Sequence, residues 1–314
     1  TGKWLSGSTD IFSLIGEVLL EPLSEEEREF LFLMGLSDEF TKEQASYLWE
    51  GGGYGGNSEK LLNSLSKNNA FIARTDDTYR YHHMLQQCAR QCFSQKPKEY
   101  QQKIYTRLGD WYMEQEDYVP AYYAYVKSEN YEKFLSCIEK DRIESLNAEH
   151  ANEFFSWIEL CPEEILLQHP NALTVGMLAM FTFNRIEGLY RLKSLLLKSL
   201  EINEALSEEE KNNLLGDAEI SESFTAFNDI SAMSAYHRWA CALLGRSTYS
   251  VNPRDLWTFG SPSILMLYHR AAGFTDAENE EMKECMPYYY QVTEGHGNGA
   301  EHGFEAELHY ERGE

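Results

Sequence analysis

Apolar residues recur every three or four positions along most of the chain, which is the spacing of amphipathic helices. A first helix is predicted after Ser24, because Ser24 and Glu27 have capping-box spacing and an apolar stripe continues from there to Gly35. Thr41 is expected to cap a second helix and Ser58 to start a third. The pattern therefore predicts three closely spaced helices near the start of the chain.

The apolar period changes after the third helix. Residues 70–74 and 79–82 are typical of short strands, and the residues between them have the composition of a tight turn. A fourth helix is predicted from His83 to about Gln95. Three helices followed by a small hairpin make a winged helix, which we expect at residues 20–95.

Beyond residue 95 the pattern predicts paired helices. Six residues have the offsets of a tetratricopeptide repeat, in which small residues let two helices approach and aromatic rings fill the groove between them. They are Tyr105, Leu108, Gly109, Tyr112, Ala121 and Tyr125. Glu116 takes the place of the glycine that is usual at the turn between the helices. A partial second match places Ala306 and Gly313 seven residues apart.

Further helices are predicted between these two matches. Their approximate ranges are 131–160, 171–205, 222–245, 262–273 and 276–290. The expected fold class is all-α, with a small winged helix followed by a tetratricopeptide-like superhelix over residues 96–314. Stacked helix pairs provide a binding surface more readily than a catalytic scaffold.

Charge and composition restrict the partners of such a protein. The 314 residues include 27 basic and 51 acidic side chains, a formal net charge of −24. A phosphate backbone would be repelled unless a local basic patch existed, and the candidate recognition helix 58–69 offers only Lys60 and Lys67. No apolar run is long enough to cross a membrane. We expect a cytoplasmic protein whose six cysteines are reduced thiols.

One stretch could hold a metal. His82 and His83 precede Cys88 and Cys92, and the two cysteines share one face of any helix. A structural zinc site needs four ligands, usually in two close pairs, and no second cluster occurs in the sequence. We therefore expect Cys88 and Cys92 to be core thiols, and His82 or His83 to pack or hydrogen-bond where the wing meets the helix.

The sequence gives no sign of an enzyme. The glycine-rich residues 50–60 lack the Lys-Ser/Thr of a phosphate-binding loop and follow no strand, so a flexible turn is expected. The acidic runs after Ser24 and Ser207 fit helix starts, where carboxylates complement the helix dipole. The segment Gly295–Gly299 is expected to be a loop between helices. We expect no catalysis, no metal and no cofactor in this segment.

Two motifs resemble a known family. The run from Tyr79 to Leu85 (YRYHHML) resembles a segment of the MalT-like, ATP-dependent LuxR-type transcriptional regulators of the STAND class, signal-transduction ATPases with numerous domains. Phe40–Ala45 (FTKEQA) resembles that family's entry to the second helix. The resemblance implies that residues 1–19 are a linker or helix from a preceding ATPase module and that the chain is an excerpt of a longer regulator.

The resemblance also implies a function. In that family a phosphate-binding-loop ATPase module precedes the winged helix, and a helix-turn-helix follows the tetratricopeptide-like sensor. The chain would then be a signal-sensing segment in which ATP binds upstream, DNA is bound only by a separate C-terminal domain, and the winged helix packs within the ATPase switch. Its expected partners are its own ATPase module and a small-molecule inducer or protein on the repeat surface, with no membrane. The alternative is a free-standing helical-repeat scaffold that binds a protein partner.

The helices from about 222 to 273 are the predicted signal-binding surface. They combine aromatic faces with charged donors, as a site for a polar small molecule or an acidic peptide would. The candidate ligand-binding residues are His237, Arg238, Trp257, Tyr268, His269 and Arg270. The competing interpretation is that the aromatic residues belong to the core and that the adjacent His-Arg pairs are half-buried helix edges.

Overall fold

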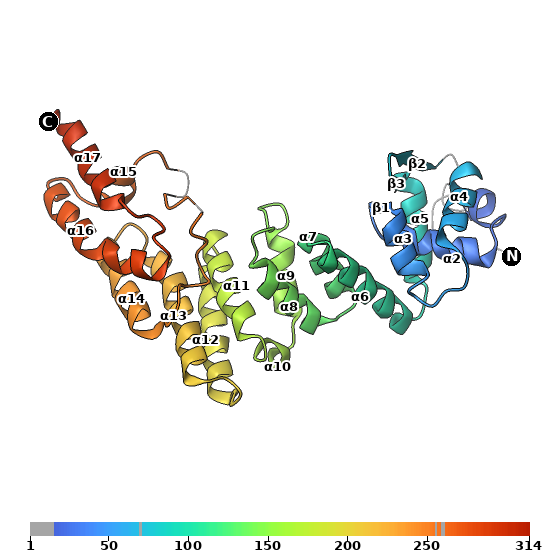
Figure 1. The fold of residues 1–314 in the computed structure, drawn as a ribbon, viewed down its shortest axis with the longest axis horizontal. Coiled ribbons are helices and arrows are strands. Elements are labelled where there is room, and N and C mark those ends of the chain that lie inside the picture. The colour runs from blue at the N-terminus through green and yellow to red at the C-terminus, as the bar shows by residue number, and fades with distance from the viewer. Residues whose placement is uncertain (1–15, 69–70, 255, 259–260) are drawn as a thin grey trace. The chain divides into compact units, whose positions relative to one another are not determined.

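The computed structural model describes residues 16–68, 71–254, 256–258 and 261–314 (Figure 1). They belong to two compact units, one extending to Phe134 and the other beginning at Leu135. Most of the predicted linker at 1–19 lies outside the described residues, and its end forms a π-helical turn, η1 (Gly16–Leu20). The proposed domain boundary near residue 95 stays a prediction.

The first unit begins with the predicted winged helix. Its elements follow each other in the order expected for that fold. They are α2 (Glu25–Met34), β1 (Glu39–Thr41), α3 (Lys42–Trp49), α4 (Ser58–Asn68), β2 (Ile72–Thr75), β3 (Thr78–Tyr81) and α5 (His83–Ser94). The strands form an antiparallel sheet in the order β1-β3-β2, with Ile72 opposite Tyr81. The strand β1 was not predicted, because three residues are too few to show a period of two.

The predicted helix starts are confirmed. The Ser24 hydroxyl accepts a hydrogen bond from the Glu27 backbone N–H at 3.2 Å, and the Glu27 carboxylate accepts one from the Ser24 backbone N–H at 3.0 Å. The Thr41 hydroxyl caps α3 by accepting a hydrogen bond from the backbone N–H of Gln44 at 3.2 Å, without the reciprocal contact. These contacts satisfy N–H groups that have no partner inside a helix, which is why the sequence signal is reliable.

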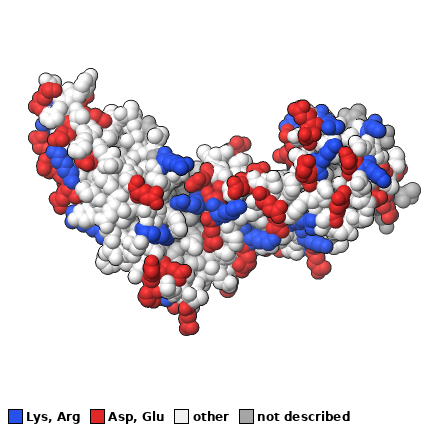
Figure 2. Space-filling view, viewed as in Figure 1, with Lys and Arg blue, Asp and Glu red and all other residues white. Residues whose placement is uncertain are grey.

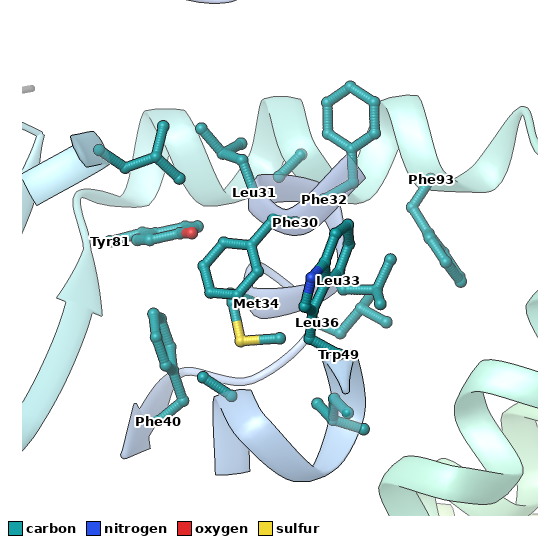
Figure 3. Close-up of a cluster of buried hydrophobic side chains, with 14 of the residues drawn as sticks. Phe30, Leu31, Phe32, Leu33, Met34, Leu36, Phe40, Trp49, Tyr81 and Phe93 are labelled. Atoms are coloured by element: carbon teal, nitrogen blue, oxygen red, sulfur yellow. The ribbon is translucent and has the colours of Figure 1, made fainter. Parts of the chain in front are cut away.

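The core of the winged helix combines aromatic rings with many aliphatic side chains (Figure 3). Phe30 of α2 meets Trp49 of α3 edge to face, with ring centroids 5.4 Å apart. Phe40 on β1 contacts the rings of Tyr79 and Tyr81 on β3. Each of these side chains is almost completely buried, and burial of one such ring stabilises a fold by roughly 1.5–3 kcal/mol. The short sheet and the helices therefore share one hydrophobic core.

A helix pair follows the winged helix within the same unit. It consists of α6 (Lys98–Glu114) and α7 (Tyr118–Lys127), joined by a short turn. Gly109 lies against the Tyr125 ring, and a Cβ atom there would be 2.6 Å from a ring carbon. Glu116 adopts a left-handed backbone with φ of 58°. The predicted repeat offsets are confirmed, including the turn position usually occupied by glycine.

The second unit consists of helices that mostly pack as antiparallel neighbours. The helix α8 (Tyr131–Asp141) ends in this unit. The remaining elements are α9 (Ala151–Leu160), α10 (Glu163–Leu166), α11 (Pro170–Thr182), α12 (Ile186–Ile202), α13 (Glu208–Ser223), the 3₁₀ turn η2 (Phe224–Ala226), α14 (Ile230–Leu243), α15 (Ile264–Tyr268), α16 (Thr275–Val292) and α17 (Ala300–Arg312). The helix α11 packs on α12, α13 on α14, and α16 on both α14 and α17. The winged helix followed by helix pairs confirms the predicted fold class.

Several helical ranges predicted for this unit contain breaks. The range 131–160 divides after Asp141, and the range 171–205 divides at Asn184, which has φ of 57°. The range 222–245 joins the end of α13 to α14. The apolar stripe continues across each break because both helices face the same core, so periodicity alone does not reveal the turn. The helix expected at 262–273 has only five residues, Ile264–Tyr268.

Candidate functional site

The candidate ligand residues lie around α14, α15 and α16. His237 is buried in α14, where its Nε2 lies 3.1 Å from the Ser223 hydroxyl. That hydroxyl donates to the Ile220 carbonyl, so it accepts from His237, and Nε2 carries the ring proton. The Nδ1 atom is buried, with no hydrogen-bond partner among the described residues. Burial lowers the pKa of His237 to about 4, so a neutral imidazole sits in the core.

Arg238 faces the neighbouring helix instead. Its Nη2 lies 3.0 Å from a carboxylate oxygen of Glu284 on α16, and its guanidinium covers the Tyr288 ring at 4.1 Å from the centroid. A second guanidinium nitrogen donates to the Tyr288 hydroxyl at 3.2 Å. Arg238 therefore braces α14 against α16. The pair is largely solvent-exposed, so it adds little stability.

Trp257 and Tyr268 form a stack. Their ring centroids lie 5.1 Å apart with planes 16° from parallel. Tyr268 is buried and also packs on Phe227. Gly297 in the glycine-rich loop lies so close to Trp257 that a Cβ atom would be 2.5 Å from the ring. The loop predicted at Gly295–Gly299 is confirmed, and its glycines let it approach the tryptophan.

His269 and Arg270 bind the first turns of α16. The Nδ1 of His269 lies 2.7 Å from the carboxylate of Glu278, which also accepts from the Arg270 backbone N–H at 2.9 Å. Burial alone would raise the pKa of Glu278, but the hydrogen bond from His269 and the backbone N–H groups outweigh it and hold that pKa below its usual value. The Arg270 guanidinium pairs with Asp229 at 2.8 Å and with Glu281.

The structure brings these residues into one region and shows what holds them. Arg270 and Arg238 pair with Glu281 and Glu284, which lie three residues apart and therefore on one face of α16. An anionic ligand would have to displace these carboxylates. The signal-binding role of His237, Arg238, Trp257, Tyr268, His269 and Arg270 stays a prediction, and intramolecular partners account for most of their polar groups.

Sequence reasoning missed two cavities in the second unit. One, of about 550 Å³, lies between α9, the α11–α12 turn and α12, where Phe155, Arg185 and Arg191 line it. The other, of about 430 Å³, lies between the turn after α8, one face of α11 and residues 249–252. The lining residues come from segments up to about a hundred positions apart. No sequence spacing could have indicated either cavity.

The cysteines of the winged helix lie in its core. Cys88 and Cys92 are fully buried on one face of α5, which confirms the prediction of core thiols. The hydrogen bond to Cys88, together with burial, raises the pKa of Cys92. His82 caps α5, its Nδ1 accepting from the Met84 N–H at 3.4 Å, and its ring meets Phe71 edge to face. In the described part of the chain, no three His, Cys, Asp or Glu side chains are grouped to hold a metal.

Acidic and basic side chains are interspersed on the face of the molecule drawn in Figure 2. The helix α4 carries Lys60 and Lys67 on its exposed surface, while Lys42 beside it pairs with Glu59 at 3.1 Å. No helix within the described residues has the length and apolar character needed to cross a membrane. The prediction that the chain does not bind DNA stays untested by these features.

The comparisons with known proteins gave one family-model match and one structural match. Residues 15–101 match the family model of the MalT winged helix domain, which confirms that resemblance for this part of the chain. The chain is also similar to the crystal structure of a signal transduction ATPase with numerous domains (STAND) with a tetratricopeptide repeat sensor from Pyrococcus horikoshii. The sequence identity is 17%, the TM-score is 0.47, and the match covers 98% of this chain and 47% of that one. No curated protein sequence matches the chain.

Proposed function

We propose that the chain is the regulatory, signal-sensing segment of an ATP-dependent STAND-type transcriptional regulator of the LuxR family and performs no catalysis of its own. The observation that carries this proposal is the MalT-type winged helix at residues 15–101, continuous with a tetratricopeptide-like helix pair. In such a regulator the repeat region would sense an inducer or a protein partner. The protein would be cytoplasmic, with ATP bound by an upstream module and DNA by a separate C-terminal domain.

Contacts within the first unit support a relay from the repeats to the winged helix. The Tyr54 hydroxyl, in the glycine-rich turn of the winged helix, lies 2.5 Å from the Tyr100 hydroxyl on α6. Tyr100 also donates to Glu29 of α2, which pairs with Lys96. A movement of α6 would therefore shift the glycine-rich turn and α2, because coupling passes through contiguous hydrogen bonds and packed side chains.

A second contact strengthens this connection. The Nε and Nη2 atoms of Arg107 on α6 donate to the Tyr47 carbonyl at the end of α3, at 2.9 and 2.6 Å. The guanidinium also covers the Tyr47 ring at 4.7 Å from its centroid. Carbonyl groups in the last turn of a helix lack partners within it, so Arg107 satisfies one of them and fixes α6 to α3.

The test uses the full-length protein that carries this chain. We expect its reading frame to encode a phosphate-binding-loop ATPase before the winged helix and a helix-turn-helix after the repeats. A metabolite that raises the melting temperature of the chain by binding its native state should also change ATP hydrolysis by the full-length protein. Absence of the ATPase module would contradict the proposal and favour a free-standing scaffold.

A substitution in the relay separates binding from transmission. Tyr100→Phe should leave inducer-dependent stabilisation intact but reduce the inducer-dependent change in ATP hydrolysis. The matched control is Tyr310→Phe, at an exposed tyrosine of α17, which should change neither quantity. An equal response of both variants to the inducer would contradict the relay.

A further inference from the structure

The smaller cavity of the second unit has the composition of a ligand site. Its volume of about 430 Å³ falls within the range of small-molecule sites. One side is largely apolar and is formed by Val175, Leu178 and Ala179 of α11 and by Phe183 just after that helix. The rest of the lining combines polar and apolar residues from two other segments. They are Arg142, Ile143, Glu144 and Leu146 from the turn after α8, and Tyr249, Ser250 and Asn252.

Arg142 is the only basic side chain that lines this cavity within the described residues. Its Nη2 donates to the Tyr249 carbonyl, and its guanidinium lies 5.4 Å from the centroid of the Tyr249 ring. No carboxylate of a described residue pairs with it, and its buried Nε has no hydrogen-bond acceptor among those residues. A guanidinium normally makes up to five hydrogen bonds, so this one retains donors for an acceptor that the described residues do not supply.

The backbone that carries Arg142 is strained. Arg142 and Ile143 have φ of 56° and 61°, and a β-branched residue in this region is a rare outlier. Each such backbone conformation costs about 1–3 kcal/mol and is kept only where contacts with the surrounding structure fix it. Here the Arg142 N–H donates to the Ile138 carbonyl at 2.8 Å, and the Asp141 carboxylate accepts from the Ser145 hydroxyl at 2.6 Å. The turn therefore holds Arg142 at the cavity.

A buried carboxylate fixes the opposite segment. Asp217 of α13 is almost fully buried and accepts from the Thr248 hydroxyl at 2.6 Å and the Tyr249 N–H at 2.9 Å, and it pairs with Arg246 at 2.7 Å. The Ser250 hydroxyl donates to the Asp217 carbonyl at 3.0 Å. This wall is preformed, which lowers the ordering cost of binding.

We propose that this cavity binds a small monocarboxylic acid, with the carboxylate on Arg142 and an aliphatic or aromatic body against α11. A planar guanidinium suits a carboxylate, and a charge-assisted hydrogen bond is about twice as strong as a neutral one. Glu144 at the rim, which accepts from Asn252 at 3.4 Å, disfavours a dianion such as phosphate beside a single cation. The proposal deepens the proposed function, because it names the ligand class of the sensing domain.

Ligand-observed saturation-transfer NMR on the whole 314-residue chain tests the proposal, with hexanoate as the probe. Hexanamide has the same apolar body without the charge. Inorganic sulfate is an anion without the apolar body and has no protons to observe, so its binding is measured by its displacement of hexanoate. We expect saturable binding of hexanoate and at least about tenfold weaker binding of the other two. Failure of hexanoate to bind, or equal binding of hexanamide or sulfate, would overturn the proposal.

Three variants locate the site. Arg142→Met keeps the left-handed backbone and much of the side-chain length, and it should weaken hexanoate binding at least about tenfold. Thr182→Trp at the exposed rim of the cavity should block hexanoate while Arg142 is intact, which keeps the test decisive if the first variant unfolds. Arg191→Met, which lines the larger cavity, should bind hexanoate normally. Loss of binding in Arg191→Met, with binding kept in Arg142→Met, would place the site elsewhere.

The two proposals can fail separately. If hexanoate binds at Arg142 but does not change ATP hydrolysis by the full-length protein, the site stands and its sensing role fails. If another molecule regulates the full-length protein and hexanoate does not bind, the sensing role stands and the carboxylate site fails.

Discussion

Single residues set the geometry of the first helix pair. Gly109 allows the Tyr125 ring to contact the backbone of α6, and Tyr125 then donates a hydrogen bond from its hydroxyl to Asp110 at 2.9 Å. Glu116 accepts a left-handed backbone that favours glycine, which allows α7 to fold back. Packing requires a glycine at position 109, because a larger residue would overlap the Tyr125 ring. At position 116 the backbone favours glycine, but the fold tolerates the free-energy cost of glutamate there.

Gly109→Ala should lower the free energy of unfolding by about 1–3 kcal/mol. The new methyl group would overlap the Tyr125 ring, which costs more than the roughly 1 kcal/mol that alanine gains over glycine in a helix. Urea denaturation measures the change. In the background of Tyr125→Leu the same alanine substitution should cost much less, and an undiminished cost there would show that the ring is not the obstacle.

His237 should make stability depend on pH. Its pKa is about 4 in the folded state and close to 6.5 when unfolded, so the unfolded chain binds more protons between these values. Above pH 6.5 the neutral His237 does not lower the free energy of unfolding. As the pH falls from 6.5 toward 4, protonation of the unfolded chain lowers that free energy by up to about 3 kcal/mol. Denaturation curves from pH 7.5 to 4.5 measure it.

The control compares two histidines. His237→Gln should flatten the fall in stability between pH 6.5 and 4.5, although it lowers stability at pH 7.5. His302→Gln, at an exposed ring, should leave the slope unchanged. An unaltered slope in His237→Gln would assign the proton uptake to other groups.

At the scale of elements, helix starts and core faces follow from the sequence. Ser24, Thr41 and Ser207 each cap a helix because a local side chain supplies an acceptor for a free N–H. The breaks were not predictable, because Arg142 and Asn184 adopt left-handed backbones without being glycine. Tertiary packing imposes these conformations, so the local amino-acid sequence does not indicate where they occur.

The same limit applies to the candidate site. The sequence identified aromatic and basic residues near α14 and α15, but not the carboxylates of α16 that pair with Arg238 and Arg270. It also gave no sign that Arg142 and Tyr249, more than a hundred positions apart, would meet at a cavity. Composition reveals which side chains are available, whereas the acceptors that each one finds depend on the fold.

Cys88→Ser should test the interpretation of α5 as a helix with a buried thiol face. A hydroxyl in place of this fully buried thiol should lower the free energy of unfolding by about 1–3 kcal/mol. Elemental analysis should give the same metal content for the variant and the parent. One zinc per parent chain that disappears in the variant would contradict the core interpretation.

At the scale of the whole molecule, charge decides which partners the winged helix can have. The formal charge of −24 opposes any polyanion unless basic residues gather on one surface. The helix α4 offers only Lys60 and Lys67 on its surface. Elsewhere in the winged helix, Lys42 pairs with Glu59 and Arg80 with Glu39. This distribution of charge favours the prediction that the winged helix packs against protein instead of contacting phosphates.

We predict that the chain does not bind duplex DNA at physiological salt. Even non-specific binding depends on neutralising several phosphates, and two lysines would supply little of the counterion release that drives it. Fluorescence anisotropy of a labelled duplex, titrated to tens of micromolar protein, measures binding. Micromolar affinity that is lost when Lys60 and Lys67 are both changed to Glu would show that α4 is a recognition helix after all. Affinity that survives this double change would also contradict the prediction and would place the DNA contact on a different surface.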